Sequence, residues 1–277
     1  MTQLRLASIN LWGNHAPWEE RKRLLMRELR SLDADVIAMQ EVLRPQGAGT
    51  SQADELARGL PYRVAFSCAT RLQRPFPSEY GNALLTRFPV REHQTVPLPV
   101  PDGTEPRCLL YVVLSVHPGL LPVFVTHLSW EPELQATRLA QTRFISDFIA
   151  QELRQLATRA PSHVQVLPPV LLGDLNASPD SPEVQQLLNQ TELPRLRDSF
   201  ALRGHGPGYT FSATNPYAIK NGKEINERID YILVGSQIVE GQELAEVTGA
   251  KLVFNQPDNG IFASDHFGVC TEIKIKL

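Results

Sequence analysis

The stretch "IFASDHFGVC", residues 261–270, places an acidic residue beside a histidine where a strand is predicted to begin. Apolar and polar residues alternate over 268–277, which is the period of a strand with one buried face. Because neighbouring side chains of a strand point to opposite faces, Asp265 and His266 can serve one site only at the rim where this strand starts. A hydrogen-bonded histidine at a polar strand start needs no function, so a site here requires other polar residues to converge on it.

Polar residues recur at the C-terminal ends of other apolar segments. These predicted strands are "LRLASIN" (4–10), "DVIAMQE" (35–41), "LPVFVTHL" (121–128) and "PPVLLGDLN" (168–176). The polar residues at or near their ends are Asn10, Glu41, His127, Asp174 and Asn176. Each alone has a simple explanation, since Asn and Asp favour turns. Together they indicate a site on one rim of a scaffold of strands.

The remaining segments alternate between short β-rich runs and amphipathic helices. Further strands are predicted at 62–68, 82–88, 107–116 and 227–234, and helices at 17–32, 133–157 and 181–188. Neither a fixed-period repeat nor a compositional break divides the chain. We therefore expect a single domain over residues 1–277.

Composition indicates a globular protein with a large core, because 42% of its 277 residues are hydrophobic and 21% are charged. The N-terminus lacks the pattern of a signal peptide, and no run of 18 apolar residues occurs. The three cysteines have no metal-type spacing, which fits thiols in a reducing cytosol and predicts a cytoplasmic location. A net charge of −3 gives no global basic field of the kind that duplex DNA-binding proteins usually carry.

The residue types at the predicted rim indicate its chemistry. Carboxylates and side-chain amides are hard oxygen ligands, which favour Mg²⁺ or Mn²⁺ over zinc in the absence of Cys or His clusters. Two histidines beside such a cation, His127 and His266, suggest charge stabilisation on a phosphoryl group or proton transfer to and from it. The pattern predicts hydrolysis of a phosphoester.

Seven motifs also resemble, in order, those of the endonuclease/exonuclease/phosphatase superfamily. They are "SIN" (8–10), "MQEV" (39–42), "GNALLTRFP" (81–89), "THLSW" (126–130), "GDLNASP" (173–179), "RIDYIL" (228–233) and "SDHFGV" (264–269). Members include apurinic endonucleases, deoxyribonuclease I, neutral sphingomyelinases, inositol polyphosphate 5-phosphatases, deadenylases and the 5′-tyrosyl-DNA phosphodiesterase. The resemblance implies an α/β fold, a four-layered α/β sandwich of two packed mixed β-sheets flanked by helices, with the site on one rim.

The resemblance also implies roles for the polar residues. Glu41 matches the principal Mg²⁺ ligand, with Asn10 beside it and Asp265 acting directly or through water. Asp174 would orient or deprotonate the attacking water, and Asn176 would hold the phosphate.

Four further residues take roles from the same resemblance. His266 would stabilise the transition state or transfer a proton, with Asp230 holding its orientation. His127 lies in the "THL" motif, as in sphingomyelinases and the tyrosyl-DNA enzyme. Arg107 matches an arginine that opens the corresponding strand, and is expected to contact substrate phosphate.

The sequence departs from the family pattern at Trp12, where apurinic endonucleases place an additional acidic residue. This departure counts against that branch and against a strict two-metal scheme. Substrate recognition is expected in the loop 68–80, where Tyr80 accompanies Arg71, Arg74 and Phe76. Such a mixture can pair with phosphate and stack on a base, although an ordinary proline-stiffened loop explains it equally well.

The sequence thus predicts a Mg²⁺-dependent hydrolase of phosphodiester bonds, with a nucleic acid or a nucleotide as the favoured substrate. A phospholipid or a small organic phosphodiester is the alternative substrate, and a catalytically silent binding module on the same scaffold is the alternative class. No apolar membrane-docking hairpin is evident, so no stable membrane association is expected. No obligate protein partner is evident either.

Overall fold

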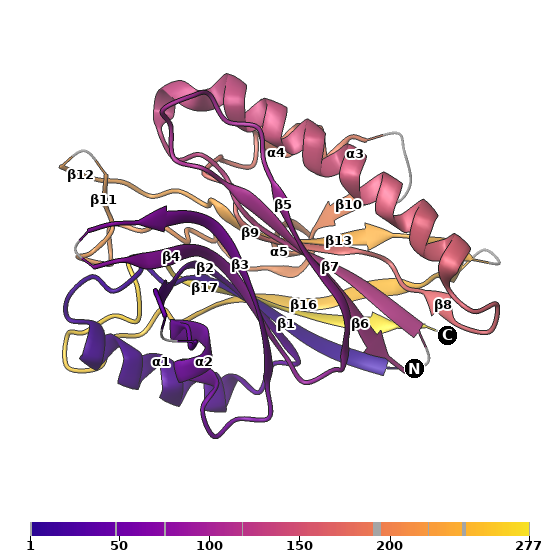
Figure 1. Ribbon diagram of the computed structural model, residues 1–277, viewed down its shortest axis with the longest axis horizontal. Helices are drawn as coiled ribbons and strands as arrows, with labels where there is room; N and C mark the ends of the chain where they lie inside the picture. Colours follow the sequence, from indigo (N-terminus) through magenta and orange to yellow (C-terminus); the bar gives the residue numbers. More distant parts are fainter. Residues whose placement is uncertain are drawn as a thin grey trace.

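The computed structural model describes residues 2–47, 49–74, 76–117, 119–190, 195–220, 222–239 and 242–276. Two large β-sheets pack face to face, and helices cover their outer faces (Figure 1). This is the expected four-layered α/β sandwich.

The first sheet brings the two ends of the sequence together. Its strands, in spatial order, are β16 (Ala245–Val253), β17 (Gly268–Ile275), β1 (Thr2–Asn10), β2 (Val36–Pro45), β4 (Ser78–Thr86) and β3 (Arg63–Leu72). The pair β1 and β2 is parallel, whereas β1 runs antiparallel to β17 with Thr2 opposite Ile275. The sheet is therefore mixed, and Asp265 and His266 lie just before β17, as predicted.

The second sheet is mixed as well. Its strands, in spatial order, are β10 (Arg195–Asp198), β13 (Asp230–Ser236), β9 (Val170–Asp174), β7 (Gly119–His127), β6 (Cys108–Val116) and β5 (Val90–Pro97), and β8 (Gln165–Val166) pairs with β7. Strands β7 and β9 are parallel, while β9 and β13 are antiparallel. Two short hairpins lie apart from the sheets, β11 (Ile219–Lys220) with β12 (Lys223–Glu224), and β14 (Ile238–Val239) with β15 (Gln242–Glu243).

Most helices cover the two outer faces, whereas the helix that carries Phe200 contacts strands of both sheets and places Phe200 in the apolar layer between them. They are α1 (Trp18–Leu32), α2 (Gln52–Ala57), the short 3₁₀ helix η1 (Pro132–Leu134), α3 (Gln135–Arg159), α4 (Pro182–Leu188) and α5 (Ser199–Arg203). Helices α1 and α2 pack on the first sheet, and α3 and α4 pack on the second. Ser181 is the N-cap of α4, because its hydroxyl accepts a hydrogen bond from Val184 N. Pro17 is the residue preceding α1 rather than its first helical residue.

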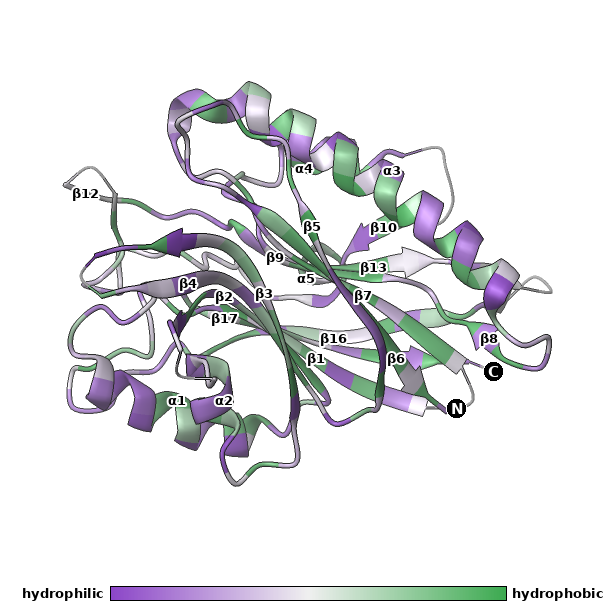
Figure 2. Ribbon diagram, viewed as in Figure 1, coloured by the Kyte–Doolittle hydropathy of each residue, from purple (hydrophilic) through white to green (hydrophobic). Residues whose placement is uncertain are grey.

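Strand periodicity explains why the core has three layers of apolar contacts. In β7, Val123 and Val125 face the opposite sheet, while Phe124 faces α3 and α4. In β1, Leu6 faces the opposite sheet and Ile9 faces α1. Figure 2 shows hydrophobic residues along the central strands and mixed colouring on the helices. Both faces of each central strand are buried, as expected of interior strands.

Two remaining predictions from composition concern the cysteines and membrane insertion. Cys68, Cys108 and Cys270 are free thiols, and the last two are buried. Among the described residues, no helix has the length and apolar character needed to cross a bilayer.

Candidate active site

A pocket of about 510 Å³ opens where the ends of strands from both sheets meet. Eight of the ten residues predicted for the site line it: Glu41, Tyr80, Arg107, His127, Asp174, Asn176, Asp265 and His266. The other two, Asn10 and Asp230, lie behind it and hydrogen-bond to lining residues. The structure therefore brings all ten predicted residues together.

Strand pairing in the second sheet sets three of these residues in one row. His127 on β7 and Asp230 on β13 are both register partners of Asp174 on β9. The preceding Gly173 has φ of 146°, and a Cβ atom added there would lie 1.9 Å from the carbonyl oxygen of Thr126. Only glycine permits this close approach of the two strands, which fixes the position of Asp174.

Glu41 is directed into the pocket by a β-bulge. The pairing of β2 with β4 shifts between Met39 and Val42, and Glu41 has a φ of 57°. A bulge changes the direction in which a side chain points and introduces local backbone strain. Among the described non-glycine residues, Trp12 and Asn176 also combine positive φ with a place in the pocket lining. Three of the six described non-glycine residues with positive φ therefore line the pocket.

Asn10 connects the two sheets at the floor of the pocket. Its Nδ2 nitrogen donates to Glu41 Oε1 at 3.1 Å and to Asp174 Oδ2 at 3.1 Å. Its Oδ1 oxygen accepts from the backbone N–H of Trp12 at 2.9 Å. In this arrangement Asn10 orients two carboxylates, and its role as a metal ligand stays a prediction.

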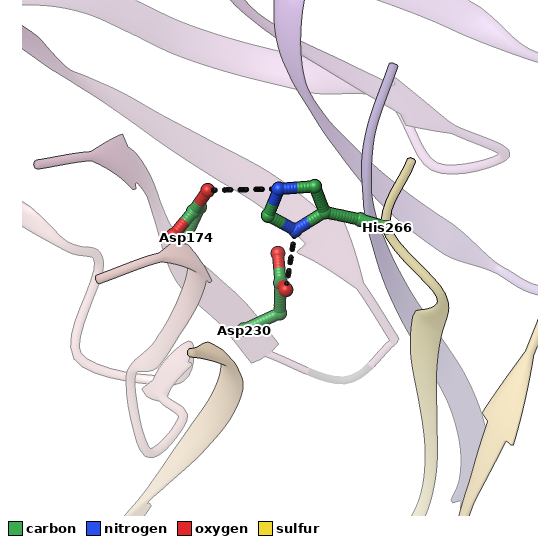
Figure 3. Close-up of side chains that lie close together, drawn as sticks. All are labelled: Asp174, Asp230 and His266. Carbon is green, nitrogen blue, oxygen red and sulfur yellow. Dashed lines mark hydrogen bonds and ion pairs between the residues drawn. The ribbon is translucent and has the colours of Figure 1, made fainter. Parts of the chain in front are cut away.

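His266 lies between two carboxylates (Figure 3). Its Nδ1 nitrogen is 2.9 Å from Asp230 Oδ2, and its Nε2 nitrogen is 3.8 Å from Asp174 Oδ2. Burial lowers the pKa of His266, but the charges of Asp230 and Asp265 outweigh it and raise the pKa well above the usual value. The imidazole is therefore held in its protonated form.

His127 is held in the opposite protonation state. Burial and the adjacent Arg107 lower the pKa of His127 well below its usual value. Arg107 Nη1 lies 3.1 Å from His127 Nδ1, and a guanidinium can only donate, so Nδ1 accepts and the proton resides on Nε2. That Nε2 atom lies 3.5 Å from Asp174 Oδ2. Two imidazoles of different charge thus face one carboxylate oxygen.

The carboxylates carry an excess of negative charge in a buried setting. Burial and then the charge of Asp230 raise the pKa of Asp174 to about 7. Burial and the charge of Glu41 raise the pKa of Asp265 to about 7, although His266 opposes the shift. A divalent cation neutralises such an excess, and hard oxygen donors are the ligands that Mg²⁺ prefers. The donor set therefore fits a hard divalent cation.

Metal-ligating atoms of Asp174, Asp230 and His266 come within 4.8 Å of one another. His266 offers no free lone pair there, because both ring nitrogens carry protons in the imidazolium form. Glu41 and Asp265 are thus better suited to hold a cation.

The sequence profile of the Endonuclease/Exonuclease/phosphatase family matches residues 7–266. The chain belongs to this family.

The individual relatives have low sequence identity to this chain. The chain is 27% identical over 245 residues to CCR4-NOT transcription complex subunit 6-like-B from Xenopus laevis, covering 74% of this chain and 44% of that protein. It thus spans less than half of that relative. A Beutenbergia cavernae endonuclease/exonuclease/phosphatase has 25% identity and a TM-score of 0.70, with 99% of this chain and 72% of that chain covered. D. rerio TDP2, solved with a single strand DNA product, has 18% identity and a TM-score of 0.71, with 99% and 100% covered.

Several residues of this family member that support the site were missed by the sequence analysis. Arg21 on α1 is fully buried and donates to five backbone carbonyls, those of Leu11, Trp12, Gly13, His15 and Ala263. It joins the loop after β1 to the loop that carries Asp265 and His266. Arg21 is a charged residue on the apolar stripe of α1, beside Trp18 and Leu25, and this position was the available indication that it is buried.

Thr210 supports Asp230 and His266 in a comparable way. Its hydroxyl accepts from the backbone N–H of Asp230 at 3.2 Å, and its carbonyl accepts from Phe267 N at 2.6 Å. It therefore fixes Asp230 relative to the segment that carries His266. No sequence pattern around this buried loop threonine indicates its role.

The loop 68–80 contributes less to the pocket than its composition suggested. Tyr80 lines the pocket, and burial raises the pKa of its hydroxyl well above the usual value. Arg71 is largely exposed and lies 3.7 Å from Glu79, and Phe76 is exposed outside the pocket lining. Whether these residues contact substrate stays a prediction.

Proposed function

We propose that this protein is a cytoplasmic, Mg²⁺-dependent phosphodiesterase whose single catalytic domain, residues 1–277, acts on nucleic-acid or nucleotide substrates. The observation that carries the proposal is the position of two buried histidines, His127 and His266, whose Nε2 atoms lie 3.5 Å and 3.8 Å from Asp174 Oδ2. A neutral imidazole and an imidazolium around one carboxylate provide hydrogen-bond donors for phosphate oxygens and one fixed positive charge.

Glu41 and Asp265 would hold the cation, because both are pocket-lining carboxylates and their charges interact. Bound Mg²⁺ supplies positive charge to phosphate oxygens and favours ionisation of water. Mn²⁺ has similar ligand preferences and should substitute for it.

Asp174 is suited to orient and deprotonate the attacking water, because a pKa of about 7 places it near the operating pH of a general base. Protonated His266 would stabilise the charge that develops on the phosphoryl oxygens as water attacks in line with the leaving group. The Nε2–H group of His127 would donate to the same phosphate, and Asn176 would help to hold it.

Two considerations favour a nucleic-acid or nucleotide substrate. D. rerio TDP2, with a similar fold, has been solved with a single strand DNA product. The net charge of −3 disfavours extensive contacts with a duplex backbone, which favours short single strands and nucleotides.

The assembly of all predicted site residues around one pocket argues against a silent binding module.

A hydrolysis screen with Mg²⁺ tests the proposal. The substrates are bis-p-nitrophenyl phosphate, oligonucleotides, sphingomyelin and inositol phosphates, and Asp174→Asn is the inactive control. We expect hydrolysis of the first two, with loss of activity in excess EDTA. Turnover of sphingomyelin or inositol phosphates alone would refute the substrate assignment, and undiminished turnover in EDTA would refute the metal.

A further inference from the structure

Trp130 presents an open aromatic surface at the rim of the pocket. Its side chain is 45% exposed, and it lines the pocket. Trp12, in contrast, stacks on His15 and Tyr217, and Trp18 is covered by the guanidinium of Arg21. Among the described residues, no ring or cation packs on the Trp130 indole. Single exposed aromatic residues are common on protein surfaces, so exposure alone assigns no role to this side chain.

The backbone on both sides of Trp130 is fixed by buried polar side chains. Gln141 is fully buried, accepts from Ser129 N at 3.1 Å and donates to Ser129 Oγ at 3.0 Å. Arg138 donates to the carbonyl oxygens of Ser129 at 3.1 Å and Glu131 at 2.7 Å. Arg138 is itself buried against Glu183, with Nε to Oε1 at 3.1 Å.

Burying an amide and an ion pair is unfavourable unless every group finds a partner. Here the partners include the N–H and C=O of Ser129 and the C=O of Glu131, which flank one exposed tryptophan, and Gln141 Nε2 also donates to Pro99 O at 3.1 Å. The arrangement fixes the backbone that carries the indole without covering the face of the ring, as expected of a preorganised contact surface.

We propose that Trp130 is the stacking platform for the base of the nucleotide that adjoins the scissile phosphodiester. The enzyme accordingly selects diesters that carry an unpaired base. This inference rests on the proposed function of the same pocket. Trp130 follows His127 by three residues, so their Cα atoms are at most about 11 Å apart, a gap that a nucleotide can span. Stacking of a base on an aromatic side chain contributes about 1–3 kcal/mol, which corresponds to about a 5- to 150-fold change in affinity.

A quaternary ammonium group is the competing occupant, since tryptophan also binds cations. Such groups are usually enclosed by several aromatic faces. The Trp12 face is already stacked, and Phe211 packs its ring against His266 with centroids 5.1 Å apart. The nearby carboxylate of Glu105 is paired with Arg107 at 3.0 Å. A single open aromatic face suits a planar, neutral base better than a quaternary ammonium group that needs several faces.

The test compares substrates that differ only in the presence of bases. One is a short single-stranded oligothymidylate, and the other is an oligomer of the same length built from abasic tetrahydrofuran residues. Glycerophosphocholine serves as the diester that carries a quaternary ammonium group instead of a base. Wild type, Trp130→Ala, Trp130→Phe and the control Phe144→Ala are compared by kcat/KM with Mg²⁺. Phe144 is an exposed aromatic residue on α3 outside the pocket lining.

We expect Trp130→Ala to lower kcat/KM for oligothymidylate about 10-fold or more, and to leave the abasic oligomer within about 2-fold. Trp130→Phe should recover most of the loss, and Phe144→Ala should have no effect. Equal losses on both oligomers would overturn the proposal, because they would indicate a structural role. A selective loss on glycerophosphocholine would overturn it in favour of cation binding.

A binding measurement separates this inference from the proposed function. With EDTA present to prevent turnover, the Kd for oligothymidylate is measured from tryptophan fluorescence and checked by calorimetry. We expect wild type to bind it about 10-fold or more tightly than the abasic oligomer, and Trp130→Ala to lose this preference. An unchanged preference in Trp130→Ala refutes the stacking role. Failure of wild type to cleave any diester refutes the proposed function, while the binding result still decides the role of Trp130.

Discussion

The Nδ1 nitrogen of His266 lies 2.9 Å from the Oδ2 oxygen of Asp230, and both side chains are buried. The other carboxylate oxygen, Asp230 Oδ1, has no hydrogen-bond partner among the described residues. No second donor among the described residues therefore shares the charge of Asp230, which acts on the imidazole and on the adjacent Asp174. The pair fixes both the orientation and the protonation state of His266.

Asp230→Asn should lower kcat about 100-fold while changing KM little, because it misorients a charged catalytic group without altering the pocket surface. Loss of the carboxylate charge lowers the pKa of His266, so the alkaline fall in activity should move to lower pH. Steady-state kinetics across pH measure both effects, with the exposed Asp147→Asn as control. Near-normal kcat with an unchanged pH profile would show that Asp230 is only structural.

Glu41→Ala should abolish turnover while the protein remains folded. Binding of Mg²⁺ to the folded state raises the Tm of wild type by mass action, and this increase should disappear in the variant. Differential scanning calorimetry with EDTA or with Mg²⁺ measures the effect separately from activity. An equal Mg²⁺-dependent increase in both proteins would place the cation elsewhere.

Gly173→Ala should destabilise the protein by about 4 kcal/mol or more, because the new Cβ atom would overlap the carbonyl oxygen of Thr126. Gly59→Ala is a matched control, since Gly59 also has positive φ but no atom within 4 Å of the added Cβ. Gly59→Ala should lower the free energy of unfolding by about 1 kcal/mol, because only the left-handed backbone conformation disfavours alanine there. Urea unfolding measures both values, and similar costs would mean that the two strands can separate locally.

Arg21→Lys should destabilise the protein by about 3 kcal/mol and lower kcat/KM, because an ammonium group cannot reach all five carbonyls. The exposed Arg23→Lys on the same helix is the control. Unfolding in urea and Mg²⁺ affinity by calorimetry provide the readouts. Wild-type Mg²⁺ affinity in Arg21→Lys would show that the arginine does not position the loop that carries Asp265.

Binding to intact duplex DNA should be weak and only modestly dependent on salt. Six to ten phosphate contacts cause affinity losses of about 10³-fold or more between about 50 and 200 mM salt. A protein with a net charge of −3 should make fewer contacts and lose less. Fluorescence anisotropy with a duplex and a matched single strand measures how the affinity for each falls with salt concentration. Tight duplex binding with a steep salt dependence would reverse the preference for single strands over duplex.

The predictable part of the fold was the part encoded by local periodicity. Interior strands such as β7 and β9 carry apolar residues on both faces, and the polar residues at their ends, His127 and Asp174, are read directly from the sequence. Strand β5 (Val90–Pro97) was missed, because it lies at a sheet edge and most of its side chains are exposed. Strand β16 was missed as well, since its burial pattern departs from strict alternation.

The supporting residues of the site could not be predicted, because their contacts join segments far apart in the sequence. Arg21 contacts Ala263, and Thr210 contacts Phe267 through its backbone carbonyl. Nothing near Gln141 in the sequence indicates that it fixes the backbone beside Trp130. Residue types at strand ends identified the chemistry of the pocket, whereas the residues that hold those groups in place appeared only in the structure.

Strand β1 lies between β2 and β17, so the first and last strands of the sequence are neighbours. Asn10 ends β1, and His266 just precedes β17. During synthesis, the segment that carries Asn10 and Glu41 leaves the ribosome long before the one that carries Asp265 and His266. A nascent chain therefore has no complete pocket until β17 is released and pairs with β1. A chain that stops before β17 would carry Asn10 and Glu41 without their partners Asp265 and His266.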